Sequence, residues 1–237
     1  MRAMRSRIAV LASGGGTNLQ AILGYFDAIG ERRCGDVVLV ASNRRDAGAL
    51  ERARARDIPI AVLPAPARPD APALGALLRE HEIDLVVLAG YLKLVPPDVI
   101  DTFTGRIINV HPALLPAFGG AGMYGERVHR AVLDAGVKVT GVTAHFVDRE
   151  YDRGRIIAQW PVPVFPGDDV PSLAARVLRV EHLLYPRVVD AVAGGRLTLA
   201  AYAAAGEAGL LDTRPAFTLL PHDDARLAEN MGIVLGA

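Results

Sequence analysis

Short, continuous runs of Val, Ile and Leu alternate with helix-like segments through the first half of the chain, and this alternation constrains the fold more than any other feature. The strand-like runs lie at residues 8–12, 37–41, 58–63, 85–89 and 106–110, and the helix-like segments at 18–26, 47–56 and 72–81. Strands that are apolar throughout, rather than at alternate positions, are buried on both faces of a sheet. Strands separated by helices are joined by right-handed crossovers into a parallel sheet. The sequence therefore predicts a doubly wound, Rossmann-like α/β fold with a mostly parallel sheet.

The pattern changes after residue 124. A helix-like segment at 124–135 is followed by longer strand-like segments at 138–147 and 155–164, which a charged loop separates. This arrangement is typical of an antiparallel hairpin with a long loop. A long amphipathic helix then spans 169–192 and ends at a pair of glycines. We expect one domain over residues 1–200, with this C-terminal hairpin and long helix, and a C-terminal extension of unknown role over 201–237.

Composition narrows the class of protein. The chain has 237 residues, with 26 basic and 26 acidic side chains, so its net charge gives no indication of a nucleic-acid or membrane partner. No run of apolar residues is long enough for a transmembrane helix, and the basic start is interpreted as leading into a first strand rather than as a signal peptide. Cys34 is the only cysteine, which rules out an intrachain disulfide and a thiolate metal cluster and fits a reducing cytoplasm.

Two polar side chains stand at the end of the strand predicted at 106–110. Asn109 and His111 are two positions apart, so they point to the same side of the sheet, and Pro112 then stops the strand. An amide donor, a titratable imidazole and a nearby carboxylate such as Asp152 are the groups that acyl transfer requires. The simpler alternative is a strand end with two polar residues and a surface aspartate, and short motifs alone do not decide between them.

A glycine-rich loop lies between the first strand and the first helix, at residues 13–18. Glycines allow backbone amides to approach an anion, and the helix dipole adds to the attraction. The loop lacks the Lys that ends a nucleoside-triphosphate loop, and Leu19 occupies the third glycine position of a dinucleotide fingerprint. The loop therefore favours a single phosphate monoester, with an ordinary tight turn as the alternative.

The other polar positions are less specific. Residues 89–95 form the exit of a strand, which suits a flat heterocycle, but this evidence alone favours an ordinary strand-to-loop exit. His145 is interpreted as a core histidine, and Glu181 with His182 as a surface pair on a helix. No spacing of His or acidic residues indicates a metal site, so none is expected.

Together these segments resemble the glycinamide ribonucleotide formyltransferases, the folate-dependent enzymes of purine synthesis. The resemblance runs from about Ile8 to Leu199 and rests on motifs at residues 13–22, 88–90, 108–116, 141–147, 152–159 and 181–186. It implies transfer of a formyl group from 10-formyltetrahydrofolate, as cosubstrate, to the amino group of glycinamide ribonucleotide. The resemblance also implies a monomer or homodimer that binds small molecules and needs no metal.

The resemblance also implies roles for single residues. Asn109, His111 and Asp152 match the catalytic trio, and Glu181 matches the residue that holds the substrate amine. The match to the substrate phosphate site comprises Gly15, Gly16, Thr17 and Asn18. The match to the folate site comprises Arg68, Tyr91, Leu92, Lys93, Leu94, Val95, Arg106 and Asn109. The sequence departs from the family pattern at residues 117–125, which are longer and richer in glycine, and at Ala113, where Ser is frequent.

Three other functions fit the same motifs less well. A formyltetrahydrofolate deformylase would share the trio with water as acceptor, but it usually carries an extra N-terminal domain. A methionyl-tRNA formyltransferase would need a nucleic-acid-binding domain, for which the tail has few basic residues. A non-catalytic nucleotide- or folate-binding module could use the same fold, although the intact trio argues against it.

Overall fold

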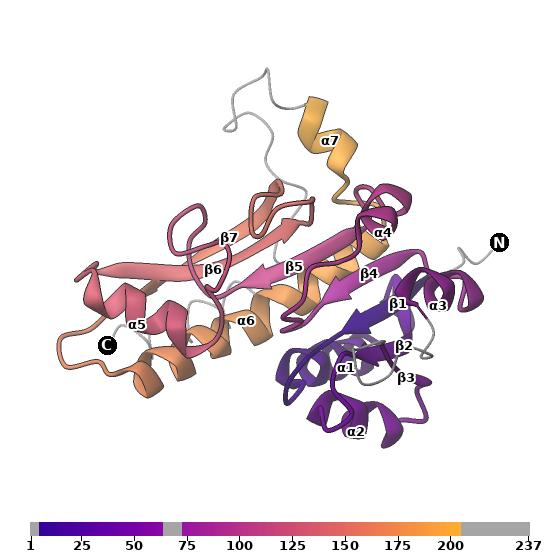
Figure 1. Ribbon diagram of the computed structural model, residues 1–237, viewed down its shortest axis with the longest axis horizontal. Helices are drawn as coiled ribbons and strands as arrows, with labels where there is room; N and C mark the ends of the chain where they lie inside the picture. Colours follow the sequence, from indigo (N-terminus) through magenta and orange to yellow (C-terminus); the bar gives the residue numbers. More distant parts are fainter. Residues whose placement is uncertain (1–4, 64–72, 205–237) are drawn as a thin grey trace.

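The computed structural model describes residues 5–63 and 73–204, and within them a seven-stranded sheet has the order β3-β2-β1-β4-β5-β6-β7 (Figure 1). The parallel strands are β1 (Ser6–Leu11), β2 (Gly35–Ser42), β3 (Ile60–Val62), β4 (Leu85–Leu88) and β5 (Ile107–His111). The last two, β6 (Val139–Phe146) and β7 (Ile156–Pro163), add an antiparallel hairpin to the β5 edge. The predicted mostly parallel sheet with a C-terminal hairpin is confirmed.

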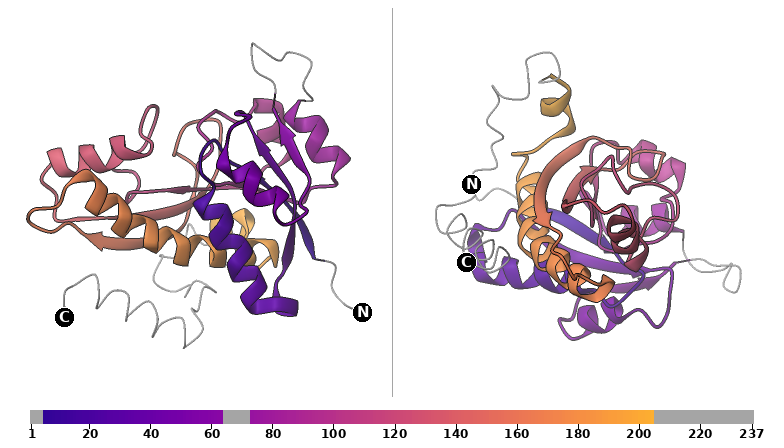
Figure 2. Two further views of the ribbon diagram at one scale, coloured as in Figure 1. Left: turned by 90° about the horizontal axis from the view of Figure 1, so that it is seen from below. Right: turned by 90° about the vertical axis from the view of Figure 1, so that its left-hand side faces the viewer.

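Helices cover both faces of this sheet, so the fold has three layers (Figure 2). One face is covered by α1 (Thr17–Ile29), α2 (Gly48–Arg54), α5 (Glu126–Asp134) and the long α6 (Val170–Ala193). The other face is covered by α3 (Leu74–Glu80) and α4 (Pro97–Thr102). In β1, Ile8 and Val10 belong to the first core cluster, whereas Ala9 and Leu11 belong to the second. This alternation confirms that the continuous apolar runs are strands buried on both faces.

The sequence missed the short elements. The 3-10 turn η1 (Gly30–Arg32), α4 and α7 (Leu199–Ala204) were not anticipated, and β3 keeps only the middle of the run predicted at 58–63. In α4 only Val99 and Ile100 are buried, and its six residues, fewer than two helical turns, cannot establish a periodicity. The predicted helix at 72–81 is α3, and its first position, Pro72, lies outside the described residues, as do residues 205–237 of the predicted extension. Among the described residues, no helix combines the length and the apolar character needed to cross a membrane.

The long helix α6 is fixed to the sheet at the strand ends that matter for the site. Asp169 begins it with a capping box, in which its carboxylate accepts from the Ser172 N–H. Further along, the buried hydroxyl of Tyr185 lies 2.8 Å from the carbonyl oxygen of Leu88, in β4, and 3.1 Å from that of Ile108, in β5. Glu181 is one turn before Tyr185 and therefore shares its face of the helix. This docking brings Glu181 to the carboxyl end of β5.

Candidate active site

The site lies at the switch point of the sheet, where the chain leaves β1 and β4 towards opposite faces. Ligands of doubly wound folds bind in the crevice at this point. The loops after the two strands are joined there, because the Ser13 N–H donates to the Gly90 carbonyl over 3.0 Å and the Leu92 N–H donates to the Ser13 hydroxyl over 2.9 Å. A cavity of about 410 Å³ opens beside them, a volume in the range of small-molecule sites.

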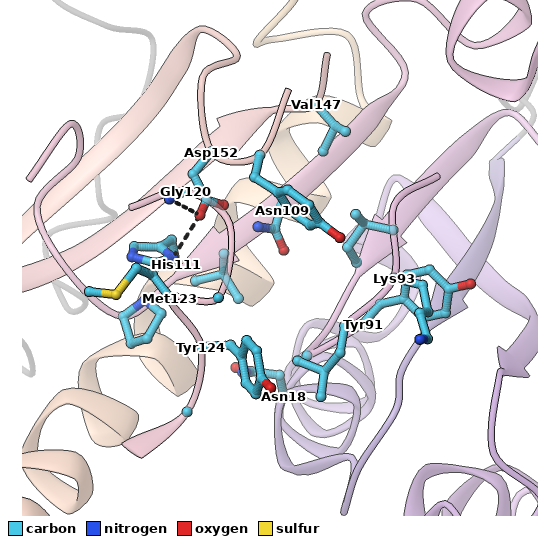
Figure 3. A pocket seen from close by; sticks show the side chains of 18 of the residues that line it. Asn18, Tyr91, Lys93, Asn109, His111, Gly120, Met123, Tyr124, Val147 and Asp152 are labelled. Atoms are coloured by element: carbon cyan, nitrogen blue, oxygen red, sulfur yellow. Dashed lines mark hydrogen bonds and ion pairs between the residues drawn. The ribbon is translucent and has the colours of Figure 1, made fainter. Parts of the chain in front are cut away.

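The cavity brings together most of the residues that the sequence singled out (Figure 3). It is lined by the predicted residues Asn18, Tyr91, Leu92, Lys93, Leu94, Val95, Asn109, His111, Asp152 and Glu181. Gly15, Gly16, Thr17 and Arg106 are not among its lining residues, and Arg68 lies outside the described residues. The exposed Arg106 side chain instead donates to the Thr102 carbonyl and lies over the Phe103 ring.

His111 is the last residue of β5 and is buried, with an oxygen atom facing each ring nitrogen. Its Nε2 lies 2.8 Å from the Phe118 carbonyl, which can only accept, so Nε2 carries a proton. Its Nδ1 lies 3.5 Å from Oδ2 of Asp152. Two acceptors around one imidazole suit the doubly protonated ring, but burial opposes the charge.

Burial has the largest effect on the charge of His111. Burial lowers the pKa of His111, while the Asp152 carboxylate and the Phe118 carbonyl raise it, and the net pKa lies below the ordinary value of 6.5. Asp152 thus favours the imidazolium but does not outweigh desolvation. His111 is therefore mostly neutral at pH 7 and gains a proton most readily when negative charge develops beside it.

Asp152 is held as a carboxylate at the tip of the β6–β7 loop. Its Oδ2 accepts from the Gly120 N–H over 2.9 Å, and its Oδ1 lies 3.6 Å from Nε2 of His145. Burial alone would raise the pKa of Asp152, but the interactions with His145, Gly120 and His111 lower it below the usual value of 3.8. The residue adopts a left-handed conformation with φ 56°, which Asp and Asn tolerate better than most side chains.

Asn109 is oriented by the histidine opposite it in β6. Asn109 and His145 are register partners, and Nδ2 of Asn109 lies 3.1 Å from Nε2 of His145. Nδ1 of His145 lies 2.8 Å from the Phe146 carbonyl, so Nδ1 carries a proton, and in the neutral ring Nε2 accepts from the Asn109 amide. The second amide N–H of Asn109 is left for the cavity. His145 is indeed a core histidine, but it positions a candidate catalytic group.

The glycine-rich loop ends at the N-terminus of α1, where Gly16 is the N-cap in a left-handed conformation. The first-turn N–H groups of a helix have no acceptor inside the helix, which makes this end a ready site for an anion. Asn18, the second residue of α1, reaches the cavity, and its Nδ2 donates to Oε2 of Glu181 over 2.6 Å. Burial raises the pKa of Glu181 to about 7 despite that hydrogen bond. The surface pair suggested for Glu181 and His182 is wrong, because Glu181 is buried.

The opposite wall of the cavity is apolar and open. Leu92 and Leu94 are 43% and 50% exposed, an uncommon state for large apolar side chains, and both line the mouth. Tyr91 is half-buried beside them, and burial raises the pKa of its hydroxyl. A rim of this kind suits a flat, partly apolar ligand.

Sequence reasoning missed several lining residues in the glycine-rich segment 117–125 and in α5. Met123, Tyr124 and His129 line the cavity, and the first two are labelled in Figure 3. Gly119 packs closely here, because a Cβ atom at this position would lie 2.4 Å from Cδ2 of Leu115 and 3.2 Å from Cβ of Asp152, so the Leu115 side chain would have to move. Only the high glycine content marked this segment in the sequence.

The arrangement can stabilise a developing oxyanion and move a proton. An amide donor and an imidazole face the same cavity, and a carboxylate stands behind the imidazole. Among residues 5–63 and 73–204 no group of three or more His, Cys, Asp or Glu side chains is placed to hold a metal ion.

Several known proteins are similar to this chain in sequence and fold. The formyl transferase family model matches residues 6–189. Phosphoribosylglycinamide formyltransferase of Arabidopsis thaliana, a chloroplastic protein, is 46% identical over 199 residues, which are 81% of this chain and 67% of the plant protein. The Escherichia coli K12 enzyme of that name is 41% identical over 198 residues, which are 81% of this chain and 89% of that protein. Glycinamide ribonucleotide transformylase 1 from Symbiobacterium toebii superposes with a TM-score of 0.72 at 44% identity, covering 81% of this chain and 89% of that one.

Proposed function

Because the chain belongs to the phosphoribosylglycinamide formyltransferase family, we propose that it transfers the formyl group of 10-formyltetrahydrofolate to the amino group of glycinamide ribonucleotide in purine biosynthesis. The products are formylglycinamide ribonucleotide and tetrahydrofolate. The observation that carries the proposal is that Asn109, His111, Asp152 and Glu181 line one cavity at the switch point of the sheet.

Asn109 and His111 act on the formyl group. The amine attacks the formyl carbon, a C–N bond forms, and negative charge develops on the formyl oxygen. The free N–H of Asn109 donates to that oxygen, and so does the Nδ1–H that His111 gains on protonation, since Nδ1 lies as far as 3.5 Å from Oδ2 of Asp152. One such donor is typically worth about 2.7–4 kcal/mol. The developing negative charge offsets the desolvation that lowers the pKa of His111.

Asp152 and Glu181 manage the protons and the amine. Expulsion of tetrahydrofolate breaks the bond between the formyl carbon and the folate nitrogen. The attacking nitrogen loses a proton, and the departing folate nitrogen gains one. Asp152 stabilises the His111 imidazolium and assists this transfer through water. Glu181, held by Asn18, accepts an N–H of the substrate amine and orients its lone pair towards the formyl carbon.

The two ends of the site suit the rest of the substrates. The backbone amides of residues 15–18 and the N-terminus of α1 hold the phosphate. Residues 91–95, together with Arg68 and Arg106, contact the folate. The half-buried Tyr91 and the exposed Leu92 and Leu94 supply apolar surface for its flat rings.

The formyltransferase domain extends over residues 1–200, followed by the extension at 201–237. The protein works in the cytoplasm as a monomer or homodimer, with small molecules as its ligands and without a metal, a nucleic acid or a membrane. Its single cysteine and balanced charge support this assignment.

The decisive experiment mixes the purified protein with both substrates and follows formylglycinamide ribonucleotide by mass spectrometry and tetrahydrofolate by absorbance. Formation of both products at equal rates is expected. Formate release without glycinamide ribonucleotide would instead identify a deformylase. Tight folate binding without turnover would identify a binding module, and either result would overturn the proposal.

A further inference from the structure

The carbonyl groups of the glycine-rich loop are held from behind by α2. The Gly14 carbonyl accepts from the Ala49 N–H over 3.1 Å. The next carbonyl, that of Gly15, accepts from Nε of Arg52 over 2.8 Å. Both donors belong to α2, and nothing in the proposed reaction requires Arg52 to touch a substrate.

These two bonds determine where the loop's amide hydrogens point. In a trans peptide the C=O of one residue and the N–H of the next lie in one plane and point in opposite directions. Bonds from α2 to the Gly14 and Gly15 carbonyls therefore turn the N–H groups of Gly15 and Gly16 away from α2. These are the amides that the proposed function gives to the phosphate, together with those of Thr17 and Asn18. Successive N–H groups on one side of a loop form a concave anion site.

Arg52 is itself fixed. Its Nη1 donates to Oε1 of Gln20, in α1, over 3.2 Å, so the guanidinium spans from the loop to the helix that follows it. The packing behind the loop is tight, because a Cβ at Gly16 would lie 2.6 Å from Cα of Ala49 and a Cβ at Gly48 would lie 3.1 Å from the Gly15 oxygen. Glycine peptides otherwise rotate easily, so a fixed guanidinium has an ordering effect that a less constrained side chain lacks.

We propose that Arg52 is a positioning residue for the substrate phosphate: it bonds the Gly15 carbonyl, orients the Gly16 N–H and so prepares the loop for an anion. This inference rests on the proposed function for the identity of the phosphate ester. The positive charge of Arg52 also lies behind the loop and adds to the attraction for the anion. Arg52 therefore determines how strongly the enzyme prefers glycinamide ribonucleotide over the same molecule without its phosphate.

The test compares kcat/KM for glycinamide ribonucleotide and for the dephosphorylated riboside in wild type, Arg52→Met and Arg54→Met. Arg54 is on the same helix but is exposed and paired with Glu51, so its variant is a matched control. The ratio of the two kcat/KM values is expected to fall at least tenfold in Arg52→Met, through KM for the ribonucleotide, and to stay within twofold in Arg54→Met. The conservative variant Arg52→Lys keeps a donor and is expected to restore part of the ratio.

A general structural role would give a different result. Loss of folding around α2 would lower kcat/KM for both substrates alike and raise KM for the folate, leaving the ratio unchanged, and that outcome overturns the inference. Calorimetry with ribose 5-phosphate separates the inference from the proposed function. Weaker binding to Arg52→Met than to Arg54→Met supports the inference even if wild type turns over neither substrate, and equal binding refutes it.

Discussion

The amide nitrogen of Asn18 donates to Oε2 of Glu181 over 2.6 Å and so joins α1 to α6 across 163 residues of sequence. Asn18 also belongs to the loop proposed for the phosphate, and Glu181 is the group proposed for the amine. In the proposed function the two ends of one substrate would therefore contact side chains that are hydrogen-bonded to each other. Oδ1 of Asn18 is buried and has no hydrogen-bond partner among the described residues.

Replacing Glu181 by Gln is expected to change how stability depends on pH. The pKa of Glu181 is raised to about 7 in the folded state from 4.5, so the folded protein holds this proton more tightly than the unfolded chain. Below pH 4.5 the burial of Glu181 therefore leaves the free energy of unfolding unchanged. This free energy falls as the pH rises towards 7, and above pH 7 it is lower by roughly 3 kcal/mol. Urea unfolding at pH 5 and pH 8.5 should show Glu181→Gln gaining stability relative to wild type at the higher pH. A pH-independent difference would mean that Glu181 titrates normally.

Asp152→Asn is expected to keep the fold and reduce kcat by at least about 100-fold, because the proton transfer loses its carboxylate. Asn tolerates the left-handed φ of 56° at this position, so the loop should retain its shape. Asp57→Asn is a matched control, since Asp57 is exposed and has φ 55°. Stopped-flow turnover and thermal unfolding of both variants check the prediction. A kcat near that of wild type in Asp152→Asn would remove the residue from the mechanism.

The pKa of His111 provides a separate measurement. In the empty wild-type protein it is expected below 6.5, because burial outweighs Asp152 and the Phe118 carbonyl. Asp152→Asn removes one of the contributions that raise it, so the pKa should fall further. Titration of the ¹⁵N-labelled imidazole by NMR measures both values. A pKa that rises in the variant would show that Asp152 does not favour the imidazolium.

The sequence predicted what depends on local pattern. Apolar runs such as 8–12 and 85–89 are strands because their residues face two cores, and Asn109 and His111 share a side because strand residues alternate. The polar residues were placed at strand ends, and doubly wound sheets bind ligands at the carboxyl ends of their strands, but the strand order that locates the switch point comes from the structure.

What the sequence could not show depends on contacts between distant segments. The partner of Asn18 is 163 residues away, and the bond from Arg52 to the Gly15 carbonyl joins residues 37 apart. His145 resembled an ordinary core residue because its role appears only once β6 pairs with β5. Arg106 was matched to the folate site by motif, but its side chain packs on Phe103 outside the cavity lining. Its folate contact therefore stays a prediction.

A double-mutant cycle can test whether His145 acts through Asn109. Asn109→Ala is expected to lower kcat about 10²–10³-fold, the usual cost of one oxyanion donor. His145→Gln loosens the amide that it holds and should cost less. If His145 acts only by orienting Asn109, adding His145→Gln to Asn109→Ala should change kcat little further. Fully additive losses would instead indicate that His145 acts by another route, such as its contact with Asp152.

Gly16→Ala is expected to damage the loop and the fold together. Gly16 has φ 74°, and an added Cβ would lie 2.6 Å from Cα of Ala49, a backbone atom that cannot yield without moving α2. The strain should cost about 1–3 kcal/mol of unfolding free energy and weaken binding of ribose 5-phosphate. Gly15→Ala is the matched control for stability, because a Cβ there meets nothing within 4 Å, and its unfolding free energy should stay within about 0.5 kcal/mol of wild type. Urea unfolding and calorimetry measure the two effects, and equal stability of the two variants would show that α2 does not pack against the loop as described.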